Sequence, residues 1–84
     1  MHVDEVFAAL ASPVRRKILA GLRRGPRPVS DLAGDFEIGR PAVSEQLAVL
    51  RRAKLVRVEV RGRERFYHLD PRPLAAVRRY LAAF

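Results

Sequence analysis

A short segment near the middle of the chain carries side chains that can form hydrogen bonds with the edges of nucleic-acid bases. Arg40 can donate two hydrogen bonds to guanine, and Gln46 can form an equivalent pair with adenine. Ser44 can bond to several bases, while Pro41 and Ala42 offer apolar surface to a thymine methyl group. These five residues are therefore the candidates for reading base pairs, although Gln46 could equally face a phosphate or no partner at all.

The spacing of the neighbouring apolar residues places these side chains on an amphipathic helix. Val43, Leu47 and Leu50 recur at intervals of four and three, so they form one apolar stripe and leave the polar residues on the solvent side. Gly39 can serve as the N-cap, and the proline in the first turn lacks only an N–H that has no helical partner there. The helix is expected to end at about Ala53. An ordinary amphipathic surface helix would show the same pattern, so the flanking segments must decide.

The balance of charge indicates a polyanionic partner. The chain has 84 residues and carries 17 Lys and Arg against 9 Asp and Glu, a formal net charge of +8. Most of the basic residues are Arg, which forms bidentate contacts with phosphate and with guanine, so nucleic acid is the expected partner. An anionic membrane surface would favour one helix with opposed basic and apolar faces, whereas here the charge is spread over every segment. Genomic base composition is a further explanation for the abundant Arg.

The length and the residue types bound the class of protein. Eighty-four residues make one domain, residues 1–84, with a small core. No Cys is present to form a disulfide or a zinc thiolate, so dimerisation is the remaining common way to stabilise such a domain. There is no leader pattern and no apolar run of 18 residues, so we expect a cytoplasmic protein.

The apolar periodicity predicts a winged helix-turn-helix fold of the mainly α (α+β) class. Helices are expected over residues 3–10, from Ser12-Pro13 to near Gly25-Pro26, from a Ser30 cap to Phe36, from a Gly39 cap to about Ala53, and over residues 72–83. Between the fourth and fifth helices the period changes from 3.6 to 2. Residues 56–60 and 65–69 are therefore expected to form a two-stranded β-hairpin, the wing, with a tight turn at residues 61–64.

A second set of residues is predicted to contact the nucleic-acid backbone: Arg51, Arg52, Arg61, Gly62 and Arg63. The first two lie near the end of the fourth helix, where they could instead complement the helix dipole. The two arginines of the hairpin turn could lie along phosphates or enter a narrow minor groove. The glycine between them supplies the positive φ that a tight turn needs.

Three basic residues, Arg15, Arg16 and Lys17, lie at the start of the second helix, where positive charge is unfavourable. This arrangement indicates either an anionic partner or pairing of one of them with Asp4 or Glu5.

The first and last helices contain more apolar residues than one small core should need. The candidates for a dimer interface are Val3, Phe7, Leu74, Val77, Tyr80, Leu81 and Phe84. The alternative is that they only close the core of a monomer. A two-fold dimer would place two DNA-reading helices roughly 34 Å apart, about one turn of the duplex.

Four segments, in order and at matching spacing, resemble the ArsR-type (ArsR/SmtB-like) winged helix-turn-helix transcriptional regulators. They are residues 7–19, residues 29–33, residues 40–47 with Leu50, Arg51 and Leu55-Val56, and residues 61–63 followed by residues 67–69. The resemblance covers nearly the whole chain. It implies a homodimeric DNA-binding repressor that recognises an imperfect palindrome in double-stranded DNA and dimerises through its N- and C-terminal helices.

The chain departs from the metal-sensing members of that family. Those members carry Cys at the start of the third helix, or His and acidic ligands along the last helix. Here the first region reads Pro-Val-Ser-Asp, and no His, Cys, Asp or Glu follows Asp70. His2 and His68 are far apart in sequence, so we expect no metal site and no other cofactor. Gln46 also stands where many relatives have His, which could change the sequence preference.

Other classes of function fit the sequence less well. Catalysis would need a nucleophile and base brought together in a pocket that 84 residues leave little room for, so no enzyme is expected. A protein-interaction module, an RNA-binding winged helix and a non-specific architectural nucleic-acid binder stay open as alternatives. No set of polar residues points to a pocket for a small-molecule effector.

Overall fold

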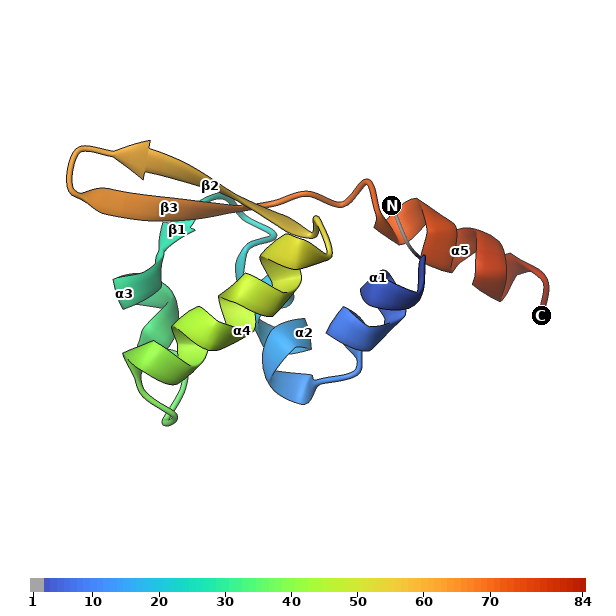
Figure 1. The fold of residues 1–84 in the computed structure, drawn as a ribbon, viewed down its shortest axis with the longest axis horizontal. Coiled ribbons are helices and arrows are strands. Elements are labelled where there is room, and N and C mark those ends of the chain that lie inside the picture. Colours follow the sequence, from blue (N-terminus) through green and yellow to red (C-terminus); the bar gives the residue numbers. More distant parts are fainter. Residues whose placement is uncertain (1–2) are drawn as a thin grey trace.

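Four helices precede a β-hairpin and one helix follows it in the computed structural model, which describes residues 3–84. The helices are α1 (Val3–Leu10), α2 (Pro13–Gly21), α3 (Val29–Ala33), α4 (Arg40–Arg52) and α5 (Leu74–Ala82), and the strands are β1 (Arg27–Pro28), β2 (Val56–Arg61) and β3 (Glu64–Leu69). The hairpin of β2 and β3 projects from one end of the molecule, and α1 and α5 lie at the other end (Figure 1). This arrangement confirms the winged helix-turn-helix fold.

Local sequence fixes where two of the helices begin. The Ser12 hydroxyl accepts a hydrogen bond from the backbone N–H of Arg15 at 3.3 Å, and Pro13 follows in the first turn of α2. Gly39 is the N-cap of α4 and has a φ of 83°, which a residue with a side chain rarely adopts. Both caps confirm the sequence prediction.

The third helix differs from its prediction. It begins at Val29 rather than after Ser30, and its N-cap is Pro28, which forms no side-chain hydrogen bond. The predicted cap at Ser30 is therefore wrong, because the chain enters α3 directly from strand β1. The helix also ends at Ala33, so Phe36 lies beyond it, where it still packs against the core. Helix α2 likewise ends at Gly21, before the expected stop, and a turn leads from it toward Gly25.

The sheet has a third strand that the sequence analysis did not predict. Strands β2 and β3 pair in antiparallel register from Val56 opposite Leu69 to Arg61 opposite Glu64. The two-residue strand β1 adds to the other edge of β3 and gives the order β1-β3-β2. The middle of β3 is thus paired with the segment that leads into α3.

The core lies where α1, α2, α3, α4 and the base of the wing meet. Its buried side chains are Val6, Ala9, Ile18, Leu19, Leu22, Leu32, Val43, Leu47, Leu50, Ala53, Leu55 and Val56. Three of them form the predicted apolar stripe of α4, so the core fixes which sides of that helix face outward. Among residues 3–84, no helix combines the length and the apolar character needed to cross a bilayer.

Candidate nucleic-acid interface

Helix α4 presents its polar residues on two different flanks. Val43, Leu47 and Leu50 are buried, and Arg40, Ser44 and Arg51 fall along one side of that stripe because they recur at intervals of four and seven. Pro41 is exposed on the outward side, whereas Ala42 and Gln46 are half-buried on the opposite flank. The five predicted base-reading residues therefore do not form one patch.

The flank that contains Arg40 and Ser44 forms one wall of an open groove. We call this hollow of about 620 Å³ the basic groove; it is lined by Val29, Arg40, Ser44, Leu47, Ala48, Arg51, Arg52, Lys54, Arg65 and Tyr67. Strand β3 supplies the other wall. Within the described chain, none of its four arginines and its one lysine is in an ion pair. Five unpaired cations along one hollow give a surface suited to a polyanion.

The basic groove continues toward the tip of the wing. A second hollow of about 360 Å³ is lined by Pro28, Val29, Ser30, Arg40, Arg63, Glu64 and Arg65. It shares Val29, Arg40 and Arg65 with the basic groove, so the two hollows run on from one another. The start of α4 thus lies between the groove and the turn of the wing.

The two faces of the wing differ in how their arginines are held. Arg65 is two residues from Tyr67, which packs against the core, so it shares the inner face of the strand with the groove. Arg61 lies on the outer face, where its Nη2 donates to Glu59 Oε1 at 3.0 Å and its guanidinium lies 4.5 Å from the centre of the Phe66 ring. Gly62 has a φ of 59°, as predicted for the turn. Of the two predicted wing arginines, Arg63 forms no ion pair or side-chain hydrogen bond with any residue from 3 to 84.

Glu59 is the acceptor at the centre of the outer face. His68 Nε2 lies 2.6 Å from Glu59 Oε1, and because a carboxylate can only accept, the imidazole must donate. Hydrogen bonds from Arg61 and then from His68 lower the pKa of Glu59 from 4.5 to about 2. His68 is therefore a hydrogen-bonded residue of the wing. His2 lies outside the described residues, and within those residues no three His, Cys, Asp or Glu side chains converge in a way that could hold a metal.

None of Arg15, Arg16 and Lys17 forms an ion pair with Asp4 or Glu5 within residues 3–84, so that part of the prediction is wrong. Arg15 donates from Nε to the Ala9 carbonyl at 2.7 Å and from Nη2 to the Ala8 carbonyl at 3.0 Å. Arg16 donates to the Leu10 carbonyl at 2.7 Å. The two arginines thus satisfy carbonyls at the C-terminus of α1, where the negative end of the helix dipole favours positive charge.

Gln46 is joined to this cluster. Its Oε1 accepts a hydrogen bond from Arg15 Nη1 at 2.8 Å, which connects α4 to α2. Because this oxygen is occupied, only the side-chain NH2 group of Gln46 is left to bind another partner. This contact was not predicted from the sequence, although the cluster of positive charge at the start of α2 was a signal for it.

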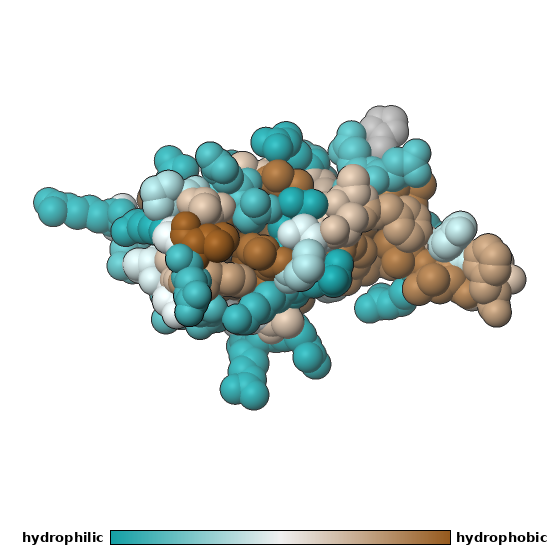
Figure 2. All heavy atoms as spheres, turned by 90° about the horizontal axis from the view of Figure 1, so that it is seen from below, coloured by the Kyte–Doolittle hydropathy of each residue, from teal (hydrophilic) through white to brown (hydrophobic). Residues whose placement is uncertain are grey.

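Apolar side chains gather at the end of the molecule away from the wing. No residue of α5 is buried; Leu74 and Val77 pack partly against the core, but Tyr80, Leu81 and Phe84 are 53%, 59% and 91% exposed. Phe7 and Tyr80 meet edge to face with their ring centres 5.3 Å apart, and Val3 is exposed beside them on α1. Figure 2 shows tan and brown, apolar side chains covering much of this end, whereas the side chains that project farthest at the opposite end are teal and hydrophilic.

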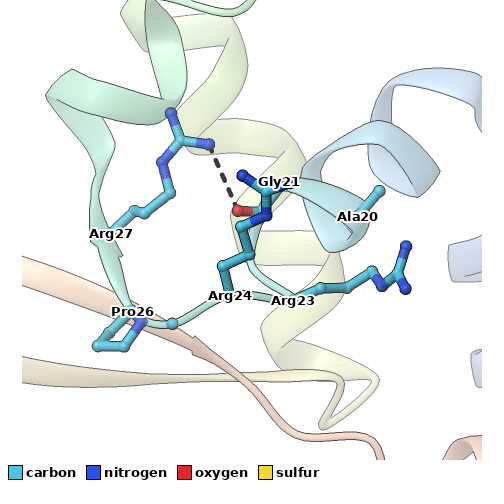
Figure 3. Close-up of a pocket in the computed structure, with 7 residues that line it drawn as sticks. Ala20, Gly21, Arg23, Arg24, Pro26 and Arg27 are labelled. Atoms are coloured by element: carbon cyan, nitrogen blue, oxygen red, sulfur yellow. Dashed lines mark hydrogen bonds between the residues drawn. The ribbon is translucent and has the colours of Figure 1, made fainter.

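A further hollow of about 700 Å³ lies at the loop between α2 and β1 (Figure 3). Arg23, Arg24 and Arg27 line it, and Arg27 Nη1 donates to the Gly21 carbonyl at 3.4 Å, the dashed line in Figure 3. The Arg27 guanidinium also forms ion pairs with Asp31 and Asp35. This arginine therefore fastens the end of α2 to α3, a structural role, and the hollow shares no residue with the basic groove.

Proteins similar to this chain are bacterial regulators. The pattern of the family described as "Bacterial regulatory protein, arsR family" matches residues 12–58. The chain is 46% identical over 81 residues to the HTH-type transcriptional regulator Rv2034 of Mycobacterium tuberculosis, a match covering 96% of this chain and 76% of that protein. It is 34% identical over 68 residues to the transcriptional repressor SdpR of Bacillus subtilis, covering 81% of this chain and 76% of the repressor.

The fold is shared with solved structures as well. One is the solution structure of the homodimeric winged helix-turn-helix DNA-binding domain of Mb0332 from Mycobacterium bovis, a possible ArsR-family regulator. It superposes with a TM-score of 0.80 at 26% identity, over 96% of this chain and 75% of that one.

Proposed function

The chain belongs to the arsR family of bacterial regulatory proteins, and on this premise we propose that it is a homodimeric repressor that binds a palindromic operator in double-stranded DNA. Binding at a promoter would block access of the polymerase. The observation that carries the proposal is the basic groove, five unpaired cations between α4 and the wing. With α4 in the major groove of a duplex, the phosphate strand beside it would lie along a groove bounded by a helix and a hairpin.

The side chains divide into those that read bases and those that hold the backbone. Helix α4 enters the major groove with Arg40 and Ser44 toward base edges, while Pro41 and Ala42 offer apolar contact to thymine. Gln46 contributes at most its amide NH2 group, because its oxygen accepts from Arg15. The candidates for holding phosphates lie at the end of α4 and along the wing, and they are Arg51, Arg52, Lys54, Gly62, Arg63 and Arg65. Arg61 would contribute less, because Glu59 already accepts a hydrogen bond from its guanidinium.

The exposed apolar end supports the homodimer. Val3, Phe7, Tyr80, Leu81 and Phe84 would be covered by the same surface of a second copy, with Leu74 and Val77 at its edge. Large exposed apolar side chains grouped at one end of a small domain are typical of an interaction surface. The homodimeric M. bovis relative supports the same assembly. In this dimer the two α4 helices would meet successive major grooves, roughly 34 Å apart.

The test is binding of the purified protein to duplex DNA from upstream of its own gene, followed by fluorescence anisotropy beside a scrambled duplex across a salt series. We expect the first duplex to bind at least about 10³-fold more tightly, with two protomers for each site. If about three of the candidate phosphate-holding residues in each protomer contact phosphate, about six phosphates are neutralised per dimer and the slope of log affinity against log salt should be near −5.

Other results would contradict the proposal in different ways. Equal, steeply salt-dependent binding to both duplexes, together with no enriched sequence in a random-sequence selection, would indicate an architectural DNA binder. Absence of binding to either duplex at low salt would remove the DNA function and favour a protein-docking domain.

A further inference from the structure

One guanidinium connects the C-terminus of α1, the start of α2 and the side of α4. Arg15 is half-buried, and its three nitrogens each donate to a different acceptor: Ala9 O, Ala8 O and Gln46 Oε1. The guanidinium is planar and rigid, so these three bonds fix the direction of Gln46 relative to the end of α1. An ammonium group could not hold the same three acceptors in one plane.

The contact joins the two surfaces that the proposed function requires. Helix α1 lies against α5 through Phe7 and Tyr80, within the exposed apolar end. Helix α4 carries Arg40 and Ser44 along the basic groove, on the flank opposite Gln46. A change in the orientation of α4 relative to α1 would therefore alter the distance and tilt between the two α4 helices of a dimer.

We propose that Arg15 and Gln46 are positioning residues, which set the angle of α4 to the dimer-forming helices and thereby the half-site spacing that the homodimer accepts. The inference rests on the proposed function. It assigns Gln46 a role that acts through Arg15 rather than through a base, and so differs from the adenine contact suggested by its residue type.

The chain offers a matched control. Arg16 lies next to Arg15 and satisfies the neighbouring carbonyl of α1, Leu10 O at 2.7 Å, without any hydrogen bond to α4. Arg16→Ala therefore removes a cap of α1 and one positive charge but keeps the connection to α4. Gln46→Ala removes the hydrogen bond between α2 and α4 and keeps the hydrogen bonds of Arg15 and Arg16 to the carbonyls of α1. Arg15→Lys keeps the positive charge but loses the planar guanidinium that contacts three acceptors at once.

The first experiment measures the positions of the two α4 helices without DNA. These 84 residues contain no Cys, so Ala48→Cys, at an exposed site on α4, gives one spin label in each protomer. Electron–electron double resonance then reports the distance between the labels across the dimer. We expect one narrow distribution in the Ala48→Cys background and with Arg16→Ala added, but a broadened or shifted one with Gln46→Ala or Arg15→Lys. Unchanged distributions for both of these variants would overturn the inference.

The second experiment measures the half-site spacing. The probes are the duplex that the wild-type protein selects from a random-sequence pool and two versions with the centre one base pair longer or shorter. Discrimination is the ratio of the affinities for the duplexes with the selected and the altered spacing. We expect Gln46→Ala to lower this ratio by about ten-fold. The double variant that carries both Gln46→Ala and Arg15→Lys should lower it little further, because the two residues act through one contact. Arg16→Ala should keep the wild-type discrimination.

The alternatives give distinct results. If Gln46→Ala relaxed the preference at one base pair and left the spacing discrimination intact, Gln46 would be a base reader and the inference would be wrong. If the wild-type protein selected no sequence with paired half-sites, or gave no distance between protomers, the proposed function itself would fail and the inference with it. Because Gln46→Ala keeps the caps of α1, it tests the inference even if Arg15→Lys does not fold.

Discussion

Arg61 and Arg65 lie four residues apart on the same hairpin but on opposite faces of it. Arg61 is held on the outer face by Glu59 and by the ring of Phe66. Arg65 lines both hollows of the inner face and forms no ion pair among residues 3–84. A phosphate must compete with a carboxylate for Arg61, whereas it would meet Arg65 as a free cation. The two residues therefore should not contribute equally to DNA binding.

We predict that Arg65→Ala weakens binding to all DNA sequences alike. Loss of one phosphate contact in each protomer should flatten the salt slope of the dimer by about 2. Arg61→Ala, the control on the outer face, should change the slope by less. The measurement is fluorescence anisotropy over a salt series with the same duplex, and an equal change in slope for the two variants would contradict the assignment of faces.

Base reading is predicted for the groove flank of α4. Arg40→Ala should cost roughly 1–3 kcal/mol at particular base pairs and relax the preference there, and Ser44→Ala should do so to a smaller extent. Competition between duplexes with single base-pair changes measures this loss. Arg51→Ala is the comparison on the same flank, because a residue that holds phosphate should lower all affinities uniformly. A uniform loss for Arg40→Ala would remove it from the base readers.

The apolar end is predicted to hold the dimer together. Leu81 is 59% exposed, so Leu81→Glu should leave the monomer core intact and place a charge in the interface. We expect the dimer to dissociate at least about 30-fold more readily, the change expected for a central interface residue. Ala82→Glu adds the same charge on the neighbouring, more polar flank of α5 and should leave the dimer unchanged. Sedimentation of both variants tests the prediction, which equal dissociation would contradict.

The parts of this fold that depend on local sequence could be predicted, and those that depend on tertiary contacts could not. The extent of α4 and the hairpin follows from apolar periods of 3.6 and 2, and the caps at Ser12 and Gly39 follow from residue type. Strand β1 has two residues and exists because β3 offers it a free edge, so no periodic pattern marks it. Its presence also moved the start of α3 from the predicted position.

The candidate site shows the same division. Residue types indicated that α4 and the wing are basic, but not which arginines are already occupied. Arg61 is paired because Glu59 lies two residues away on the same face of a strand, a pattern that could have been found in the sequence. The contact of Arg15 with Gln46 joins residues 31 positions apart, and only the packing of α2 on α4 brings them together.

The outer face of the wing is predicted to respond to acid. Arg61 and His68 lower the pKa of Glu59 from 4.5 to about 2, so the folded wing binds this proton less readily than the unfolded chain does. The contact therefore stabilises the wing fully above about pH 4.5, and this contribution is lost as the pH falls toward 2. Protection of the β2 and β3 amides against hydrogen exchange, measured relative to the intrinsic exchange rate at each pH, should fall over this range. Glu59→Gln should remove that dependence and Glu64→Gln should keep it, while a Glu59 carboxyl resonance titrating near 4.5 would contradict the prediction.

Lys54 occupies a position where helices commonly place glycine. The backbone N–H of Leu55 donates to Leu50 O at 3.0 Å and that of Lys54 to Arg51 O at 3.0 Å, the two hydrogen bonds of a Schellman turn after α4. Lys54 has a φ of 64°, which is unfavourable for a residue with a side chain. Its side chain lines the basic groove. We infer that the positive charge of Lys54 strengthens DNA binding, and that this contribution accounts for a lysine at a position where its backbone conformation is unfavourable.

This arrangement predicts opposite changes in stability and binding. Lys54→Gly should raise the free energy of unfolding by up to about 1 kcal/mol, because glycine adopts positive φ without steric cost. The same variant should weaken DNA binding and flatten the salt slope of the dimer by about 2, because one phosphate contact is lost from each protomer. Lys54→Asn also lacks the charge but relieves less of the strain, so it should bind DNA as weakly as Lys54→Gly while gaining less stability. Thermal unfolding and anisotropy of the two variants measure both quantities. A Lys54→Gly protein that is less stable than wild type would contradict the backbone strain, and one that binds DNA as well as wild type would contradict the phosphate contact.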